Sequence, residues 1–203
     1  MNLLTAAPPT TVTIGGRVYP INTDFRTCVQ FELLTLEDRL TPENILTMFY
    51  GSNWPQPYEE AIQKAIWFYQ LGKVEQEKDE AKRDLTKSKR SYDFEIDADA
   101  LYTSFLTAYN IDLMTDSIHW WAFRELMFGL PDETAFKQRV YYRTGDTSGM
   151  SNKQKKHFEA MRKKYSIPER GKIDRKLTLA DRDAAMKRYV EQRFEETYGK
   201  AKK

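Results

Sequence analysis

Apolar residues recur at helical spacing through much of the N-terminal half of the chain. One series runs through residues 25–40, and either Thr23 or Asp24 can serve as the N-cap of that helix. A second helix is predicted to begin at Pro42, because proline is favoured at the first helical position, and Gly51 is placed to end it. A third is predicted from about residue 58, with residues 62, 66 and 69 along one stripe.

Alternation with a period of two replaces helical spacing in two places. Residues 11–22 (TVTIGGRVYPIN) form two short extended segments around Gly15 and Gly16, a pair that can take positive φ in a two-residue hairpin. Pro20 cannot donate to a strand ladder, which favours an edge or an isolated hairpin. Residues 91–97 (SYDFEID) alternate apolar and polar side chains, which predicts an extended strip with one docked face.

The C-terminal half contains four further predicted helices, each preceded by a capping residue. The candidate caps are Asp97 or Asp99, Asp116 or Ser117, Ser151, and Thr178. The corresponding helical stretches are 98–110, 117–128, 152–165 and 179–199. Residues 141–150 are expected to form a polar loop that contains glycine.

These elements predict a mainly α protein, a helical domain with a short N-terminal β-hairpin and a basic C-terminal helical tail. Between Leu71 and Arg90, 12 of 20 residues are charged, so this segment is either a solvated helical extension or a linker. The expected divisions are 1–91 for the hairpin, a helical lobe and the charged linker, 92–166 for an aromatic-rich helical lobe, and 167–203 for a basic linker and helix.

Charge is distributed unevenly along the 203 residues, although the net charge is only +2. Residues 1–150 hold 15 Lys and Arg against 22 Asp and Glu, a charge of −7, whereas residues 151–203 hold 17 against 8, a charge of +9. We expect no signal peptide and no membrane anchor, because no apolar run is long enough and no basic residue precedes the N-terminal apolar patch. The single cysteine, Cys28, is typical of a cytoplasmic protein.

The densest aromatic stretch is DSIHWWAFRELMFGLP, residues 116–131. On a helical wheel His119 falls on the apolar side, whereas Trp121 and Phe128 fall on the polar side. His119 is therefore interpreted as a hydrogen-bonded core residue rather than a metal ligand or a base. Two alternatives stay open for Trp121 and Phe128: another lobe of the chain covers them, or they form an exposed patch that binds a protein.

Motifs of enzymes are missing from the sequence. It contains no glycine-rich phosphate loop and no H-E-x-x-H or G-x-S-x-G motif, and His119 and His157 stand 38 residues apart without a nucleophile nearby. The carboxylates of residues 93–99 lack the glycine and terminal glutamate of an EF-hand loop, so helix capping is the favoured interpretation. No catalytic, cofactor-binding or metal-binding residue is predicted.

Residues 153–165 (KQKKHFEAMRKKY) give the strongest charge signal, with a thin apolar stripe of Phe158, Met161 and Tyr165. Its cations could be solvated, bind an acidic protein or contact the phosphates of a nucleic acid. The stripe is too narrow for deep membrane insertion. Aromatic residues are also too sparse for a platform that stacks single-stranded bases.

Six stretches together resemble the bacteriophage gene product fifteen family of long-tailed phages and prophages. They are YPINTDFR (19–26), FYG (49–51), WFYQLGK (67–73), YDFEIDAD (92–99), IHWWAFRELMFGLP (118–131) and MSNKQKKHFEAMRKKY (150–165). Their order spans roughly residues 1–166. The helix after Thr178 lies outside the resemblance.

The resemblance implies a non-catalytic tail assembly protein in the host bacterial cytoplasm. Genes of this family lie between those for the tail tube and the tape measure, a position that tail assembly chaperones occupy in other phages. By that analogy, the protein binds the tape measure protein, the tail tube protein or both, and it can be a homo-oligomer. The alternatives are a permanent structural tail component and a nucleic-acid-binding protein that acts through the basic tail.

Under the assembly hypothesis, an aromatic groove would hold a partner helix while basic residues attract an acidic partner. The candidate partner-binding residues are Trp120, Trp121, Arg124, Phe128, Lys153, Lys155, Lys156, Arg162, Lys163 and Lys164. No cofactor and no membrane partner are expected.

Overall fold

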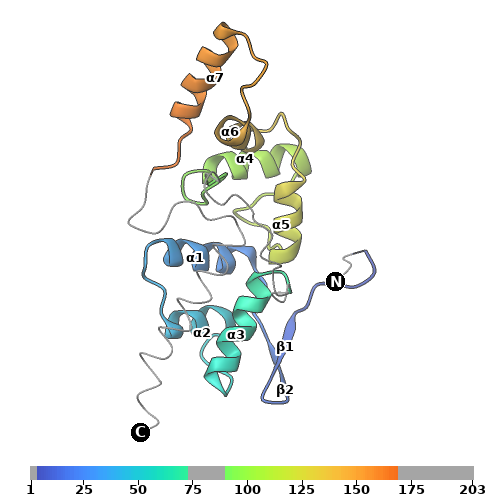
Figure 1. Cartoon of the computed structure of the whole chain (residues 1–203). Helices are drawn as coiled ribbons and strands as arrows, with labels where there is room; N and C mark the ends of the chain where they lie inside the picture. Colours follow the sequence, from blue (N-terminus) through green and yellow to red (C-terminus); the bar gives the residue numbers. More distant parts are fainter. Residues whose placement is uncertain (1–3, 73–89, 169–203) are drawn as a thin grey trace. The chain divides into compact units, whose positions relative to one another are not determined.

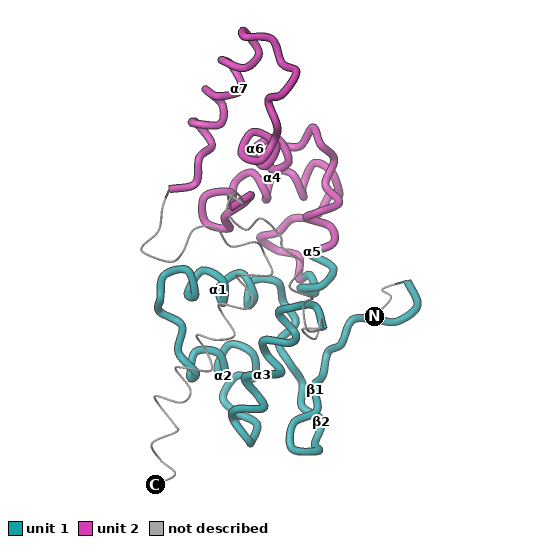
Figure 2. Tube along the Cα trace, viewed as in Figure 1, with its two compact units in different colours: residues 1–83, 118–124, 179–203 teal, residues 84–117, 125–178 magenta. Residues whose placement is uncertain are grey.

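The computed structural model describes residues 4–72 and 90–168, which divide into two compact units. Unit 1 contains residues 4–72 and 118–124, and unit 2 contains residues 90–117 and 125–168, coloured teal and magenta in Figure 2. The described residues form seven helices and one two-stranded sheet, which confirms the mainly α class and the N-terminal hairpin (Figure 1). The predicted C-terminal helix and most of the charged segment 71–90 lie outside the described residues.

The hairpin pairs β1 (Thr11–Ile14) with β2 (Arg17–Pro20) in antiparallel register, Thr11 opposite Pro20 and Ile14 opposite Arg17. Gly15 and Gly16 connect the strands with φ of 54° and 75°, the conformation that a two-residue turn of this kind requires. The Gly15 amide donates to Glu60 Oε2 at 2.8 Å, which ties the turn to α3.

Three helices complete most of unit 1: α1 (Phe25–Leu36), α2 (Pro42–Tyr50) and α3 (Tyr58–Tyr69). Residues close in sequence cap the ends of α1 and α2. Asp24 accepts from the Arg26 amide at the start of α1, and Thr41 and Asn44 form a capping box at the start of α2. Gly51 takes φ of 70° at the end of α2. The predicted first helix extended to residue 40, but α1 ends at residue 36.

Aromatic rings fill the interior of unit 1. Phe31 lies against Phe49 and Tyr69, with ring centroids 5.6 and 5.0 Å apart, and Phe49 contacts Phe68 in an edge arrangement. These four rings come from α1, α2 and α3, and each is nearly inaccessible to solvent. Their burial supplies a large share of the hydrophobic stabilisation of this unit.

Helix α5 (Trp120–Phe128) begins later than the predicted start at Asp116 or Ser117. The backbone just before α5 pairs with the entry to α1 instead of coiling: Ile118 O accepts from the Phe25 amide at 3.0 Å, and the Trp120 amide donates to Thr23 O at 2.7 Å. These bonds span nearly a hundred residues of sequence and override the local cap. Residues 120–124 of α5 belong to unit 1 and residues 125–128 to unit 2.

Unit 2 contains α4 (Ala98–Tyr109), α6 (Ala135–Thr144) and α7 (Asn152–Lys164), with α6 packed on α4 and α7 on α6 (Figure 1). Helix α6 was not predicted from the sequence, and its last four residues were expected to lie in a loop. Ser151 caps α7, as predicted, and it also forms a capping box with Gln154. No helix of the described residues is long and apolar enough to cross a membrane.

Residues 94–97 form a turn directly before α4, so the predicted extended strip over residues 91–97 is wrong. Asp93 Oδ1 accepts from the Glu95 and Ile96 amides at 2.9 and 3.2 Å, which closes the turn locally. Asp93 is buried together with the neighbouring Tyr92 and Phe94, so the alternation of apolar and polar residues does not correspond to two faces of a strand.

The Cys28 thiol should not react with 5,5′-dithiobis(2-nitrobenzoate) in the native protein. Its side chain is inaccessible, and burial raises the pKa of the thiol well above its usual value, so the reactive thiolate is scarce. Denaturant should release one equivalent of thionitrobenzoate per chain, because Cys28 is the single cysteine. All four tryptophans lie in unit 1, so their emission reports whether that unit is folded. Rapid labelling of Cys28 in a protein whose tryptophan emission is still native would contradict the burial of this thiol in unit 1.

Candidate functional site

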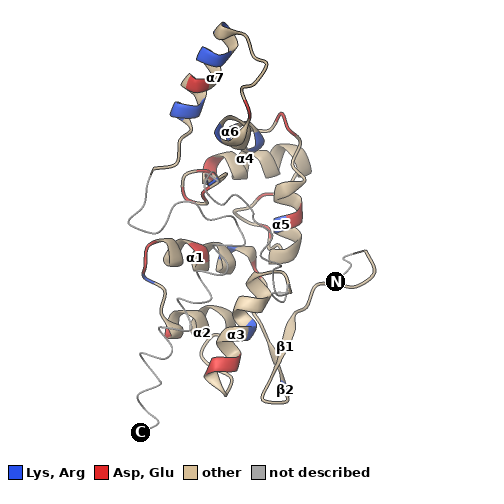
Figure 3. Ribbon diagram, in the orientation of Figure 1, with Lys and Arg blue, Asp and Glu red and all other residues tan. Residues whose placement is uncertain are grey.

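Helix α7 presents a group of lysines on the face opposite Phe158. Lys153, Lys156, Lys163 and Lys164 fall together at 3.6 residues per turn, and we call them the lysine face. All four are exposed, and among the described residues none of them has a carboxylate within ion-pair distance. Figure 3 shows the Lys and Arg positions of α7 in blue. The lysine face is therefore a positive surface open to other molecules. Lys155 is also exposed but lies toward the flank of the helix.

Helix α7 is fixed to α6 by one buried ring and one arginine. Phe158 is 3% exposed and lies between Tyr141 and Tyr142, at centroid distances of 5.3 and 5.2 Å. Arg162 Nε donates to Tyr142 O at 3.0 Å and Arg162 Nη2 to Gly145 O at 2.6 Å. These carbonyls lie at the C-terminal end of α6, where intrahelical donors run out, so the guanidinium caps α6.

A buried ion pair connects α6 to the start of α4. Arg143 donates to both carboxylate oxygens of Asp97, at 2.6 and 2.8 Å, and both side chains are almost fully buried. The Asp93 amide donates to the same carboxylate at 3.0 Å. Arg143 also donates to Ser91 O and, at 2.6 Å, to Tyr165 O, which follows the last residue of α7. One guanidinium on α6 therefore binds both the backbone before α4, at Ser91, and the backbone after α7, at Tyr165.

Arg139, one turn before Arg143, binds the same acidic segment from its exposed side. It donates to Asp99 at 2.9 and 2.7 Å and to Ile96 O at 3.0 Å. Its hydrogen bonds hold the pKa of the Asp99 carboxyl below its usual value, because they favour the charged form. Either Asp97 or Asp99 was predicted to cap α4. Asp97 does occupy the N-cap position, but its side chain makes no capping hydrogen bond, so both carboxylates serve the arginines of α6 instead.

Three of the predicted partner-binding residues on α5 are buried in unit 1. Trp120, Trp121 and Arg124 are 0%, 3% and 3% exposed. The indole nitrogens donate at 2.8 Å to Tyr69 O and Phe68 O, which lie at the C-terminal end of α3. An aromatic groove that includes Trp121 is therefore not present at the surface, because the ring packs among the residues of its own unit.

Gly72 explains how Trp121 fits. It has a φ of +71°, and a Cβ at this position would lie 2.8 Å from Trp121 Cη2. A residue with a side chain would be strained by the backbone and would collide with the indole. Phe128, the other aromatic residue in question, belongs to unit 2 and is 48% exposed. Of the α5 residues predicted to bind a partner, Phe128 is the one that presents a large side chain to solvent.

His119 makes the hydrogen bonds expected of a structural histidine. Its Nε2 lies 3.0 Å from Pro9 O, and its Nδ1 accepts from the Trp121 amide at 3.1 Å. A carbonyl can only accept, so Nε2 carries the proton. Across residues 4–72 and 90–168, no group of His, Cys, Asp and Glu side chains could hold a metal ion.

The guanidinium of Arg162, another predicted partner-binding residue, donates to α6 carbonyls and to Glu159 Oε1 at 2.7 Å. These contacts orient α7 on α6. The residues that orient the site, Arg139 and Arg143, were not identified from sequence because α6 was not. A signal was available: Thr134 as an N-cap, Phe136 and Val140 four residues apart, and a glycine at 145.

Replacing Asp97 by Asn should destabilise unit 2 by about 3 kcal/mol, because it leaves Arg143 buried without a counter-charge. Asp99→Asn is the matched control: its side chain is 71% exposed, so its loss should cost less than about 1 kcal/mol. Hydrogen exchange measured by mass spectrometry on peptides from α6 and α7 compares the two variants. If the amides of α6 and α7 were equally protected from exchange in the two variants, the buried pair of Asp97 and Arg143 would not be what holds these helices.

Trp121→Ala should destabilise unit 1 by about 3 to 5 kcal/mol, since it removes a buried indole and leaves the Phe68 carbonyl with one donor fewer. Phe128→Ala removes a half-exposed ring and should cost about 1 kcal/mol. Urea unfolding followed by the emission of the remaining tryptophans and by circular dichroism gives both values. If the Trp121→Ala protein were as stable as wild type, Trp121 would not be a core residue and would again be a candidate for binding a partner.

Comparison with known proteins identifies the family. A family model described as Bacteriophage Gp15 protein matches residues 5–167, which include nearly all described residues of both units and the whole of α7. No curated protein and no solved structure matches the chain. The match supports a phage structural or assembly protein. The chain belongs to the Bacteriophage Gp15 protein family.

Proposed function

We propose that the protein is a non-catalytic tail assembly chaperone that binds the tape measure protein, the tail tube protein or both. Membership of a phage family supports an assembly role, and the family's position among tail genes supports these two partners. The observation that carries the proposal is the lysine face of α7, a concentration of exposed positive charge on a helix whose other side is fixed to α6.

The lysine face favours an acidic protein surface as the partner. Exposed charges of one sign raise the rate of association with an oppositely charged surface, and dissolved salt screens this attraction. Few apolar side chains accompany the lysines, so charge steers the encounter and other contacts must hold the complex. Phe128, 48% exposed on unit 2, is retained as one such candidate contact. Trp120, Trp121 and Arg124 are dropped from the proposed interface because they are buried.

Co-expression of the protein with the tape measure and tail tube proteins of its phage, followed by affinity capture, tests the proposal. Capture should recover at least one of the two proteins after nuclease treatment, and recovery should fall as salt is raised. Recovery of nucleic acid alone, lost on nuclease treatment, would overturn the proposal in favour of nucleic-acid binding. Detection of the chain in purified virions would replace the chaperone role by a permanent structural one.

Neutralising two lysines of α7 should weaken the captured complex about fivefold, since each exposed ion pair contributes about 0.5 kcal/mol. The test variant is Lys156→Gln with Lys163→Gln, and the control is Arg17→Gln with Arg39→Gln, which removes the same charge from exposed positions of unit 1. Both variants have the same net charge. A difference between their dissociation constants, measured by biolayer interferometry, therefore shows that the position of the removed charges on the protein matters. Equal weakening in both would show that only overall charge matters.

A further inference from the structure

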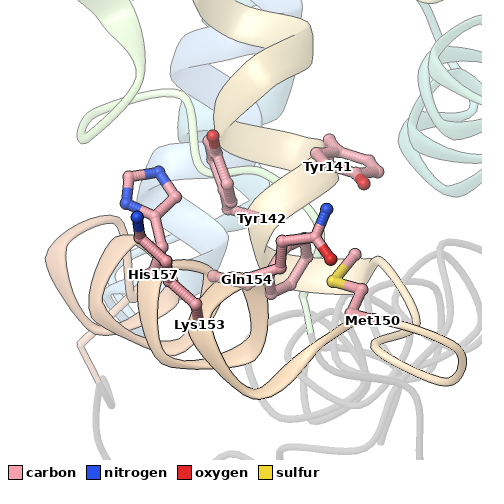
Figure 4. A pocket seen from close by; sticks show the side chains of 7 residues that line it. Tyr141, Tyr142, Met150, Lys153, Gln154 and His157 are labelled. Atoms are coloured by element: carbon pink, nitrogen blue, oxygen red, sulfur yellow. The ribbon is translucent and has the colours of Figure 1, made fainter.

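A pocket of about 340 Å³ opens beside the lysine face, between α6 and α7 (Figure 4). Its walls come from two α6 tyrosines, the loop that follows α6, and one side of α7: Tyr141, Tyr142, Met150, Lys153, Gln154 and His157. The ring of Phe158 also lines it. This volume is large enough for a single side chain of a partner and too small for a helix.

The pocket is built into the packing of the two helices. Phe158 fills the space between the tyrosines, and Arg162 ties α7 to Tyr142 O and Gly145 O. At Gly145 a Cβ would lie 2.6 Å from Tyr141 O and 2.9 Å from Phe158 Cζ, so only glycine allows this approach. Because these contacts fix the aromatic wall of the pocket, a ligand need not order that wall first.

The chemistry of the pocket differs between its two ends. In Figure 4 Tyr141 and Met150 lie at one end, and Lys153 and His157 lie together at the other. The Oε1 atom of Gln154 accepts from the Ser151 amide at 2.9 Å, so the helix cap orients its amide group. An aromatic and thioether end accepts an apolar side chain, whereas an end with a lysine and donor groups accepts a carboxylate.

We infer that this pocket binds an acidic peptide segment of the partner, with an apolar side chain between Tyr141 and Met150 and a carboxylate beside Lys153 and His157. Lys153 belongs to both the pocket and the lysine face, so one acidic segment can cover the two together. The charge of the rim and of the adjoining lysines selects an acidic occupant. The inference rests on the proposed function and adds to it the site that distinguishes one acidic segment from another.

Specificity is the consequence of this arrangement. The lysine face attracts any acidic segment, because Coulomb attraction does not depend on the apolar residues between the charges. The pocket accepts only a segment with an apolar residue at the correct position. Attraction and selection are therefore assigned to different side chains, and substitutions can separate them.

Fluorescence anisotropy of the full-length protein with two fluorescein-labelled peptides tests the inference. One is a 12-residue glutamate-rich peptide with leucines on one helical stripe, and the other carries serine in place of each leucine. Wild-type protein should bind the leucine peptide about tenfold more tightly, the effect of burying one aliphatic side chain. Labelled oligothymidylate should bind more weakly than the leucine peptide.

Met150→Ser removes part of the apolar end and should reduce the preference for leucine to less than about threefold. Met114→Ser is the matched control, because Met114 is 77% exposed in the same unit and does not line the pocket. It should keep the full preference. Lys153→Gln should weaken both peptides by a similar factor. Circular dichroism and hydrogen exchange of α7 confirm that each variant is folded.

Equal affinity of wild-type protein for the two peptides would overturn the inference, as would tighter binding of oligothymidylate. Retention of the full preference in Met150→Ser would also overturn it. These outcomes leave the proposed function to be decided by capture of the tape measure or tail tube protein. Failure of that capture, with the peptide preference intact, would show that the pocket serves a different acidic partner.

Discussion

The buried pair of Asp97 and Arg143 is the interaction on which the arrangement of unit 2 depends. A charge taken out of water is costly unless a counter-charge and hydrogen bonds replace the lost hydration. Here the guanidinium meets both carboxylate oxygens and also two backbone carbonyls, Ser91 O and Tyr165 O. Ser91 precedes the turn that leads into α4, and Tyr165 follows the last residue of α7, so satisfying one buried charge fixes α6 relative to both. The positions of the lysine face and of the pocket therefore depend on the buried pair of Asp97 and Arg143.

The two adjacent tryptophans of α5 solve a related problem in unit 1. The last carbonyls of a helix have no intrahelical donors, and a buried helix end must find them elsewhere. The indole nitrogens of Trp120 and Trp121 donate to Tyr69 O and Phe68 O at the end of α3, while the rings fill the core. Each ring therefore contributes hydrophobic burial and a hydrogen bond. The tryptophans of this aromatic-rich helix, which suggested an interface, are instead part of the core of unit 1.

The attachment of α7 and its exposed charge lie on opposite sides of one helix. On α7 one side carries Phe158 and Arg162, which attach the helix to α6, and the other side carries the lysine face. A helix with so few apolar residues is weakly stable alone, so its order depends on tertiary contacts. Fixing a basic helix in this way reduces the entropy lost when a partner binds. The same contacts form the pocket beside it.

The sequence by itself determined the features that depend on atoms a few residues apart. The hairpin at Gly15 and Gly16, a cap at Thr23 or Asp24 and the cap at Ser151 were predicted, because φ preferences and caps act within one turn of the chain. The exposed lysines of α7 were also predicted, because too few apolar residues are present to bury that helix.

Tertiary structure alone decided which residues of ambiguous pattern are buried. Trp121 lies on the polar side of its own helical wheel, but it is buried because Phe68, 53 residues away, offers a carbonyl and Gly72 leaves room for the ring. Asp97 is buried for a similar reason, since its partner Arg143 is 46 residues away on a helix that sequence periodicity did not identify. Such pairings are absent from any local window of the chain, because they exist only once distant segments have packed together.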